Sequence, residues 1–191
     1  MRTDSEIDCN AAKFMRVPHF SCAFCRKWRL PDKLYFMSYT IREARSSDLP
    51  TILQHRRKMF LDLGYTEDAA LDAMQQTSEP LIARGLAEGF YRGWLIEEAG
   101  RVVAGGGVFM ADWLSHPRGV QKKRVEIVNI YTEPEHRRRG LARLVMNTIL
   151  GWCRDEGLHA VVLHASRDGR ALYESLGFQQ TNEMRLLIKA D

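Results

Sequence analysis

The chain has 191 residues, of which 45% are hydrophobic and 27% are charged, a balance typical of a globular domain that can bury a core. No apolar run approaches the roughly 18 residues that a membrane span needs, and the first residues lack the apolar segment of a secretory signal. We therefore expect a cytoplasmic protein with no membrane partner. The net charge of +4 is uneven, because residues 1–36 hold 7 Lys/Arg against 4 Asp/Glu, whereas residues 37–191 hold 21 against 20.

Residues 1–36 show no sustained hydrophobic period, and we interpret them as a poorly ordered extension or as the product of a misassigned start before Met37. The main domain is then expected to span residues 37–191. The extension contains soft metal ligands that could together hold zinc: Cys9, His19, Cys22 and Cys25. Their spacing fits no common zinc finger and no second CxxC motif follows, so we predict no metal site.

The main domain begins with a predicted strand and two predicted helices. Alternating residues indicate a strand over residues 39–44, and the polar run Ser46-Ser47-Asp48 supplies capping side chains for a helix that ends before Gly64. Residues 66–88 form a second helical region, which we expect to break near Pro80.

A sheet with two further helices is predicted after that point. The expected elements are a hairpin of strands 94–98 and 102–110 that turns at Ala99-Gly100, a polar loop 112–123, a strand 124–132, a helix 140–156, a strand 159–165, a short helix 169–176 and a last strand 184–189. A strand, a helix and a strand in succession favour a right-handed crossover between parallel strands. The order indicates an α/β fold of the mixed α+β kind, with a central twisted mixed β-sheet flanked by helices.

Four arginines are concentrated where the predicted helix 140–156 begins. Arg137, Arg138 and Arg139 precede Gly140, and Arg143 follows it. A helix N-terminus presents free N–H groups and the positive end of the helix dipole, and glycine lets the backbone approach a bulky anion closely. We therefore predict a pyrophosphate site, with an ordinary solvated helix end as the alternative. Nucleic acid is not expected as a partner, because the domain is nearly neutral overall.

Three segments resemble motifs of the GNAT acyltransferase superfamily. Residues 137–142, RRRGLA, fit the [QR]xxGx[GA] signature that binds the acyl-CoA pyrophosphate there; residues 125–135, VEIVNIYTEPE, resemble the strand before it. Residues 171–178, ALYESLGF, are similar to the family's next motif, and the resemblance covers about residues 39–189. It implies a GNAT-like acyl-CoA N-acyltransferase fold, acetyl-CoA as the co-substrate and a homodimer.

Acyl transfer from a thioester to an amine requires an acid, a base and a donor to the oxyanion. Tyr173 occupies the position of the family's general acid, and a phenol can hold a proton for a thiolate, with packing as its alternative role. Glu126 occupies the position of a base used by some relatives, on a strand face with apolar neighbours. The alternatives are an ion pair of Glu126 with Lys123 or Arg124, and a chain of water molecules as the base.

The resemblance also implies the contacts with the cofactor. The backbone N–H of Ile130 would hold the oxyanion where its strand separates from a parallel neighbour, and the pantetheine arm would pair with that strand edge. Many relatives carry Asn at the position of Ser166, whose hydroxyl reaches less far. The expected cofactor contacts are Ile130, Tyr131, Thr132, Arg137, Arg138, Arg139, Gly140, Leu141, Ala142, Arg143, Ser166 and Tyr173.

The expected reaction is transfer of the acetyl group of acetyl-CoA to a primary amine of a small molecule or protein, by direct attack in a ternary complex. The alternative is a non-catalytic acyl-CoA-binding sensor or interaction module of the same fold, although a sensor has no need of Tyr173. The acceptor pocket is expected to form from the first two helices and the loop 111–123. Its candidate lining residues are Phe60, Tyr65, Trp94, Met110 and Trp113.

Overall fold

In the computed structural model, the described residues are 39–114 and 122–187. Their strands are β1 (Tyr39–Glu43), β2 (Tyr91–Glu98), β3 (Arg101–Asp112), β4 (Lys123–Thr132) and β5 (Val162–Leu163). Their helices are α1 (Leu49–Asp62), α2 (Asp68–Glu88), α3 (Leu141–Asp155) and α4 (Arg170–Ser175), with the short 3-10 turns η3 (Ser46–Asp48) and η4 (Pro134–His136). The extension 1–36, its candidate zinc ligands and the boundary at Met37 lie outside the described residues.

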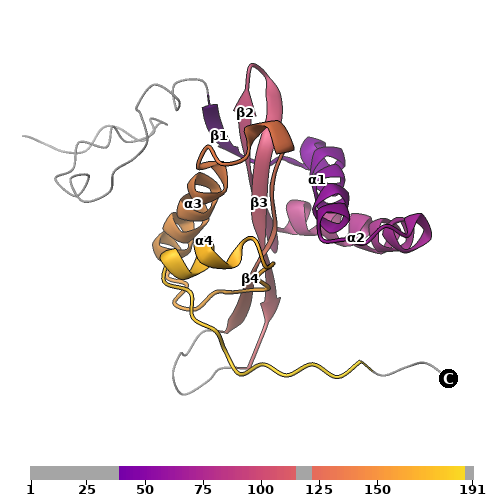
Figure 1. Ribbon diagram of the computed structural model, residues 1–191. Helices are drawn as coiled ribbons and strands as arrows, with labels where there is room; N and C mark the ends of the chain where they lie inside the picture. The colour runs from indigo at the N-terminus through magenta and orange to yellow at the C-terminus, as the bar shows by residue number, and fades with distance from the viewer. Residues whose placement is uncertain (1–38, 115–121, 188–191) are drawn as a thin grey trace, which may run out of the picture. The chain divides into compact units, whose positions relative to one another are not determined.

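The five strands form one mixed sheet in the order β1-β2-β3-β4-β5. The first three pairings are antiparallel, and β4 pairs with β5 in parallel, as a crossover through α3 predicts. Helices α1 and α2 lie on one face of the sheet, and α3 and α4 lie on the other (Figure 1). The predicted α/β mixed sheet flanked by helices is therefore confirmed. None of the described helices has both the length and the apolarity to cross a membrane.

Apolar side chains are buried on both faces of this sheet. One cluster joins the sheet to α3 and includes the fully buried Ile96, Val108, Val145 and Ile149. Cys153, on the same face of α3, is 3% exposed, and burial raises the pKa of its thiol to about 11, so it serves as a small buried hydrophobe. A second cluster packs α1 and α2 on the other face around Ile52, Leu53, Ile82 and Tyr91.

The predicted cap of α1 and the predicted break in α2 are both wrong. The Asp48 carboxylate binds the Arg42 guanidinium at 2.7 Å and the Arg45 backbone N–H at 2.7 Å, so it closes η3 and does not cap α1. Helix α2 continues without interruption through Pro80. Proline costs about 3 kcal/mol inside a helix. However, the buried Leu71 precedes Pro80 and the buried Ile82 follows it, so packing holds the parts of α2 before and after the proline against the core.

The end of the chain has less strand than predicted. Only Val162–Leu163 of the expected strand 159–165 pairs with the sheet. Residues 184–187, the described part of the expected strand 184–189, form no strand, and Met184 is 94% exposed. A strand exists only through hydrogen bonds to a neighbour, and the two-residue β5 offers almost no edge to pair with. Apolar alternation alone was therefore insufficient here.

Candidate active site

The edge of β4 is open along its second half. Its parallel pairing with β5 comprises Glu126↔Val162 and Ile127↔Leu163 only, so no described strand pairs with residues 128–132 on that side. This is the strand separation that the family resemblance implied. Unpaired backbone N–H and C=O groups at such an edge can accept an extended ligand as an added strand.

A β-bulge interrupts β4 at the same place. The register with β3 shifts between Gly105 and Gly107, so that Asn129 and Ile130 together lie opposite Gly106. Asn129 adopts a left-handed backbone conformation with a φ of 58°. A Cβ on Gly106 would lie 2.2 Å from Cδ1 of Ile130, so only glycine leaves room for this side chain over β3. The bulge turns the backbone at Ile130, the predicted oxyanion donor.

Two residues from distant parts of the chain hold Asn129 in this conformation. The Arg56 Nη1 group, on α1, donates to Asn129 Oδ1 at 2.8 Å, and Asn129 Nδ2 donates to the Tyr91 hydroxyl oxygen at 3.1 Å. Tyr91 is 2% exposed, and burial raises its pKa to about 12, so its hydroxyl remains protonated. None of these three residues was predicted from the sequence as part of the site. A polar Asn opposite a run of three glycines was the available signal for the bulge.

The arginine-rich loop before α3 passes twice through the left-handed region of backbone conformation. Arg138 has a φ of 63°, and Gly140, at the N-cap of α3, has a φ of 82°. The N–H of Leu144 bonds to the carbonyl of Gly140 at 3.0 Å, so the N–H groups of residues 141–143 precede the first helical hydrogen bond. No side chain caps this end of the helix. These amides and the helix dipole are the groups that the predicted anion site requires.

Arg137 ties this loop to α1 and β4. Its Nη2 group pairs with the Asp62 carboxylate at the end of α1, and its Nε donates to the Thr132 carbonyl at 3.0 Å. Its guanidinium also lies 5.7 Å from the centre of the Tyr131 ring. The first arginine of the motif therefore positions the loop with its side chain.

The other arginines of the cluster point in different directions. Arg139 Nη1 donates to the Tyr39 hydroxyl oxygen on β1 at 3.0 Å, and Arg143 Nη2 donates to the Ser175 hydroxyl oxygen on α4 at 2.8 Å. Arg138 is exposed. The cluster thus connects to four neighbouring elements, α1, β1, β4 and α4, as well as adding positive charge beside the α3 N-terminus.

Two of the expected cofactor contacts, Tyr131 and Leu141, have side chains buried in the core and can offer a ligand only their backbone groups. Tyr131 is 5% exposed, and its ring centre lies 5.0 Å from that of His55. Leu141 is 1% exposed and packs in the core. Ala142 is half-buried, and the buried Thr132 Oγ1 has no hydrogen-bond partner within residues 39–114 and 122–187. The Thr132 hydroxyl is therefore a side-chain group that a ligand can bind.

Ser166 belongs to the turn that begins α4. Its Oγ accepts a hydrogen bond from the Gly169 N–H at 3.0 Å, and its carbonyl accepts one from the Arg170 N–H at 3.1 Å. A Cβ on Gly169 would lie 2.8 Å from the Tyr173 ring, so Ser166, Gly169 and Tyr173 are closely packed. The serine thereby supports the helix that carries the tyrosine.

Tyr173 is half-buried on α4 and packs edge-to-face against Phe178, with ring centres 6.1 Å apart. Burial raises its pKa above the ordinary value for a phenol, so it is protonated at neutral pH. No described residue hydrogen-bonds to its hydroxyl, which leaves that group for a ligand. These properties match the requirements for a proton donor to a thiolate.

Glu126 pairs with His164, a contact that was not predicted from the sequence. The Nδ1 atom of His164, which follows β5, lies 3.0 Å from Glu126 Oε1. The alternative ion pair with a neighbour on β4 is wrong, because both basic residues pair elsewhere: Lys123 with Asp112 at 3.5 Å and Arg124 with Glu183 at 3.2 Å. Glu126 therefore has a partner across the parallel strands, where β4 and β5 begin to separate.

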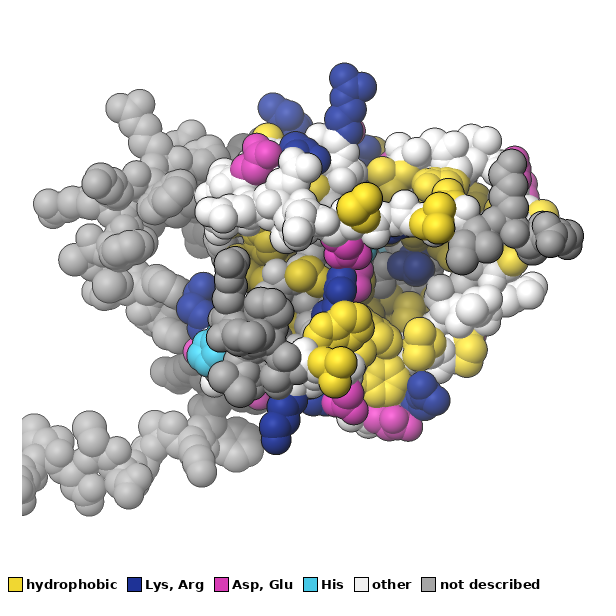
Figure 2. Space-filling view, turned by 90° about the horizontal axis from the view of Figure 1, so that it is seen from below, with side chains coloured by type: hydrophobic (Ala, Val, Ile, Leu, Met, Phe, Trp, Pro, Cys, Tyr) yellow, Lys and Arg dark blue, Asp and Glu magenta, His cyan; other side chains and the backbone are white. Residues whose placement is uncertain are grey.

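The residues expected to line the acceptor pocket do not form one cluster. Trp94 is 6% exposed and packs in the core against Trp152, with ring centres 5.5 Å apart. Phe60 and Tyr65 pack edge-to-face at the end of α1. The exposed Trp113 lies 5.0 Å from the Arg124 guanidinium instead. Seen from the end where β3 finishes, hydrophobic side chains border a recess with acidic and basic groups at its centre (Figure 2).

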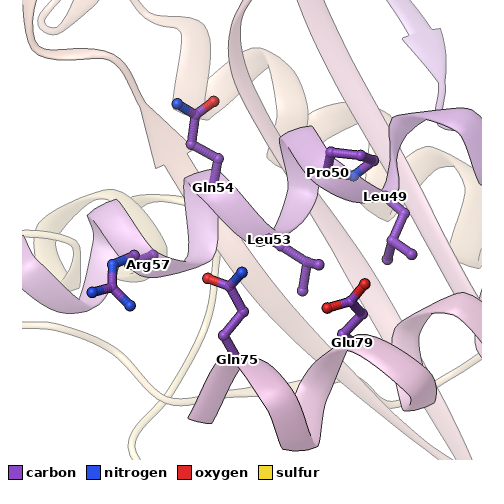
Figure 3. A pocket seen from close by; sticks show the side chains of 7 residues that line it. All are labelled: Leu49, Pro50, Leu53, Gln54, Arg57, Gln75 and Glu79. Carbon is purple, nitrogen blue, oxygen red and sulfur yellow. The ribbon is translucent and has the colours of Figure 1, made fainter. Parts of the chain in front are cut away.

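A separate hollow lies between α1 and α2 (Figure 3). It is lined by Leu49, Pro50, Leu53, Gln54, Arg57, Gln75 and Glu79. None of these belongs to β4, α3 or α4, so the hollow is not the predicted acyl-CoA site. Among residues 39–114 and 122–187, no three His, Cys, Asp or Glu side chains are grouped so that they could hold a metal ion.

Comparison with known proteins identifies the family of this chain. The model of the acetyltransferase (GNAT) family matches residues 50–178, from α1 to beyond α4. A crystal structure of a GCN5-related N-acetyltransferase from Ralstonia eutropha JMP134 is 34% identical, covers 78% of this chain and 98% of that chain, and gives a TM-score of 0.74. The chain therefore belongs to the acetyltransferase (GNAT) family.

Two further relatives show the extent of the similarity. A predicted acetyltransferase from Clostridium acetobutylicum, in a crystal structure with acetyl-CoA, shares the fold with a TM-score of 0.72 at 24% identity, over 78% of this chain and 96% of that chain. Human N-acetyltransferase 8 is 30% identical over 93 residues, which are 47% of this chain and 39% of that protein. The chain thus matches well under half the length of this curated relative.

Proposed function

We propose that this protein transfers the acetyl group of acetyl-CoA to a primary amine of a small molecule or protein, by direct attack in a ternary complex. The observation that carries the proposal is the open edge of β4 over residues 128–132, together with the uncapped N-terminus of α3. The first-turn amides of α3 suit the diphosphate, and the strand edge suits the extended pantetheine arm. Acetyl-CoA therefore fits the groups that this chain presents.

The proposed reaction assigns one step to each of three groups. The amine nitrogen attacks the acetyl carbonyl carbon, and the backbone N–H of Ile130 stabilises the negative charge that develops on the carbonyl oxygen. Glu126, with His164 beside it, accepts the proton that the amine loses. The C–S bond then breaks, and Tyr173 donates its hydroxyl proton to the thiolate of CoA. The phenolate recovers a proton from solvent, and the products are an amide and free CoA.

The names of the relatives support the same class of reaction. Human N-acetyltransferase 8 and the Ralstonia protein are both named N-acetyltransferases, and the Clostridium structure contains acetyl-CoA. Those names do not specify an acceptor, so the proposal for this chain names only the chemical class of the acceptor, a primary amine.

The test measures free CoA thiol released by the full chain from acetyl-CoA in the presence of a panel of primary amines. We expect release with at least one amine, and we expect Tyr173→Phe to lose it while acetyl-CoA still raises the melting temperature, because ligand binding stabilises the folded state. Stabilisation by acetyl-CoA without thiol release on any amine would contradict the proposal and indicate a non-catalytic acyl-CoA sensor. Arg84→Gln, at an exposed position on α2, is the control variant.

A further inference from the structure

Arg56 differs from its basic neighbours on α1 because no carboxylate lies within ion-pair distance of it among residues 39–114 and 122–187. The next residue, Arg57, pairs with Asp72 at 2.7 Å, and Lys58 pairs with Glu133 at 2.7 Å. The Arg56 guanidinium instead donates through Nη1 to the neutral amide oxygen of Asn129. Its positive charge is thus left without a negative counterpart in the described part of the protein.

The surroundings of Arg56 make this lack of a counter-charge costly. The side chain is half-buried, its guanidinium lies 5.0 Å from the centre of the Phe60 ring, and its Nε is buried without a hydrogen-bond partner. Burial lowers its pKa, although an arginine remains charged at neutral pH. A partly desolvated charge with unused N–H donors gains more from an arriving anion than an exposed one does.

The position of Arg56 places it beside the proposed reaction centre. Asn129, which it holds, immediately precedes Ile130, whose N–H is the proposed oxyanion donor. Helices α3 and α4, which carry groups proposed to bind acetyl-CoA or to protonate its thiolate, lie on the opposite face of the sheet from α1 (Figure 1). The acceptor is therefore expected on the α1 face, where Arg56 hydrogen-bonds to Asn129 of the bulge.

We infer that the acceptor is an amine that also carries a carboxylate, such as an amino acid, and that Arg56 binds this carboxylate. The inference rests on the proposed acetyltransferase function and specifies its substrate class. A planar guanidinium with unused donors matches a carboxylate in shape, and a single positive charge matches the single negative charge of this group. A phosphate would bring a charge of about −2 to a site with one cation.

The experiment compares matched pairs of acceptors with the full chain and acetyl-CoA. The pairs are α-, β- and γ-amino acids with their carboxamides, which keep the amine and remove the negative charge. We expect kcat/KM to be at least about 10-fold higher for the acid in the best pair, which corresponds to about 1.4 kcal/mol. Arg56→Gln retains a donor for Asn129 but removes the charge, so the ratio of kcat/KM for the acid to kcat/KM for the amide should fall to about 1.

Two controls separate charge recognition from support of the bulge. Arg57→Gln removes an adjacent arginine that is already paired with Asp72, so it should keep the preference for the acid. Arg56→Lys retains a positive charge and should keep part of the preference. The comparison of acids with amides in the wild type needs no variant, so a folding defect in Arg56→Gln does not prevent the test.

Three outcomes would overturn this inference. Equal kcat/KM for acids and amides in the wild type would exclude recognition of a carboxylate. An equal loss on acids and amides in Arg56→Gln, with the preference retained, would show that Arg56 acts only by positioning Asn129. Turnover of neutral amines without any preference for acids contradicts this inference alone, whereas no turnover with any amine overturns the proposed acetyltransferase function as well.

Discussion

Glu126 on β4 and His164 after β5 bring a carboxylate and an imidazole within 3.0 Å of each other. The parallel ladder ends one residue further along at Ile127↔Leu163, so the pair lies where the two strands separate. The Glu126 side chain is 30% exposed and that of His164 is 56% exposed, which leaves a route from the carboxylate to solvent. Such a pair can accept a proton from an amine and release it to water.

We predict that Glu126→Gln lowers kcat/KM by about 100-fold, because a neutral amide cannot accept the proton of the amine. The measurement is CoA thiol release across a range of pH, and the loss should be smallest at high pH, where free amine is abundant. The variant His164→Asn should give a smaller loss, since the carboxylate remains. Full activity of Glu126→Gln would mean that a chain of water molecules serves as the base.

Replacement of Tyr173 by Phe removes only a hydroxyl from a packed ring and should therefore leave the fold unchanged. We expect kcat to fall by about 100-fold or more, because the thiolate then leaves without a proton donor. Affinity for acetyl-CoA, measured by calorimetry, should stay within a few-fold of the wild type. The control is Phe178→Leu, which disturbs the edge-to-face packing but retains the hydroxyl. Unchanged kcat in Tyr173→Phe would assign the tyrosine a packing role.

Gly140→Ala should weaken acetyl-CoA binding, because φ at this position is 82° and a side chain there costs about 1–2 kcal/mol. Relief of that strain would move the α3 N-terminal amides away from the diphosphate. Gly157→Ala is a matched control, since Gly157 has a φ of 67° just beyond the other end of α3. Both variants should lose stability to urea, but only Gly140→Ala should raise the Kd for acetyl-CoA, by about 10-fold. Equal Kd values for the two variants would contradict the proposed diphosphate site.

Asn129→Ala should lower the free energy of unfolding by about 1–3 kcal/mol, because it leaves the buried Tyr91 hydroxyl without its partner. It also places an ordinary residue at a φ of 58°. Asn129→Gly accepts that backbone conformation but makes neither side-chain hydrogen bond, so it should be less destabilised than Asn129→Ala. Urea denaturation measures both values. The reverse order would show that backbone strain at the bulge is negligible.

Stability should also fall in mild acid because of His55. Burial lowers the pKa of His55 to about 4 from an ordinary 6.5; the Glu133 carboxylate opposes this shift less strongly, and the positive charge of Lys58 adds to it. Between these two values the unfolded chain binds more protons than the folded protein, so stability decreases as the pH drops from about 6.5 to about 4. This loss amounts to at most about 3 kcal/mol.

The measurement is the free energy of unfolding at pH 7 and at pH 4.5, in the wild type and in His55→Gln. The variant cannot bind a proton at this position, so the difference between the two pH values should be smaller than in the wild type. The same difference in both proteins would mean that other groups cause the acid sensitivity.

Local features of the candidate site were predictable from the sequence. The loop RRRGLA and the helix that follows it depend on neighbouring residues, because a glycine with positive φ and uncapped amides are properties of one short segment. The separation of β4 from β5 is not a local property, and it was expected only from the family resemblance. Predictions based on a single local rule were less reliable, as Pro80 inside α2 and the exposed Met184 show.

Other features were decided only by the tertiary structure. Three residues that meet at the bulge, Arg56, Tyr91 and Asn129, come from α1, β2 and β4. His164, the partner of Glu126, follows α3 in the chain. Such contacts depend on strand register and on which helix face meets the sheet, and a shift of one residue in β4 would turn each side chain to the other face. The sequence therefore indicated the family, and it pointed to the arginine-rich loop and Tyr173 as candidate site residues. Tertiary packing decided which side chains support the bulge, and it left Arg56 without a carboxylate partner among the described residues.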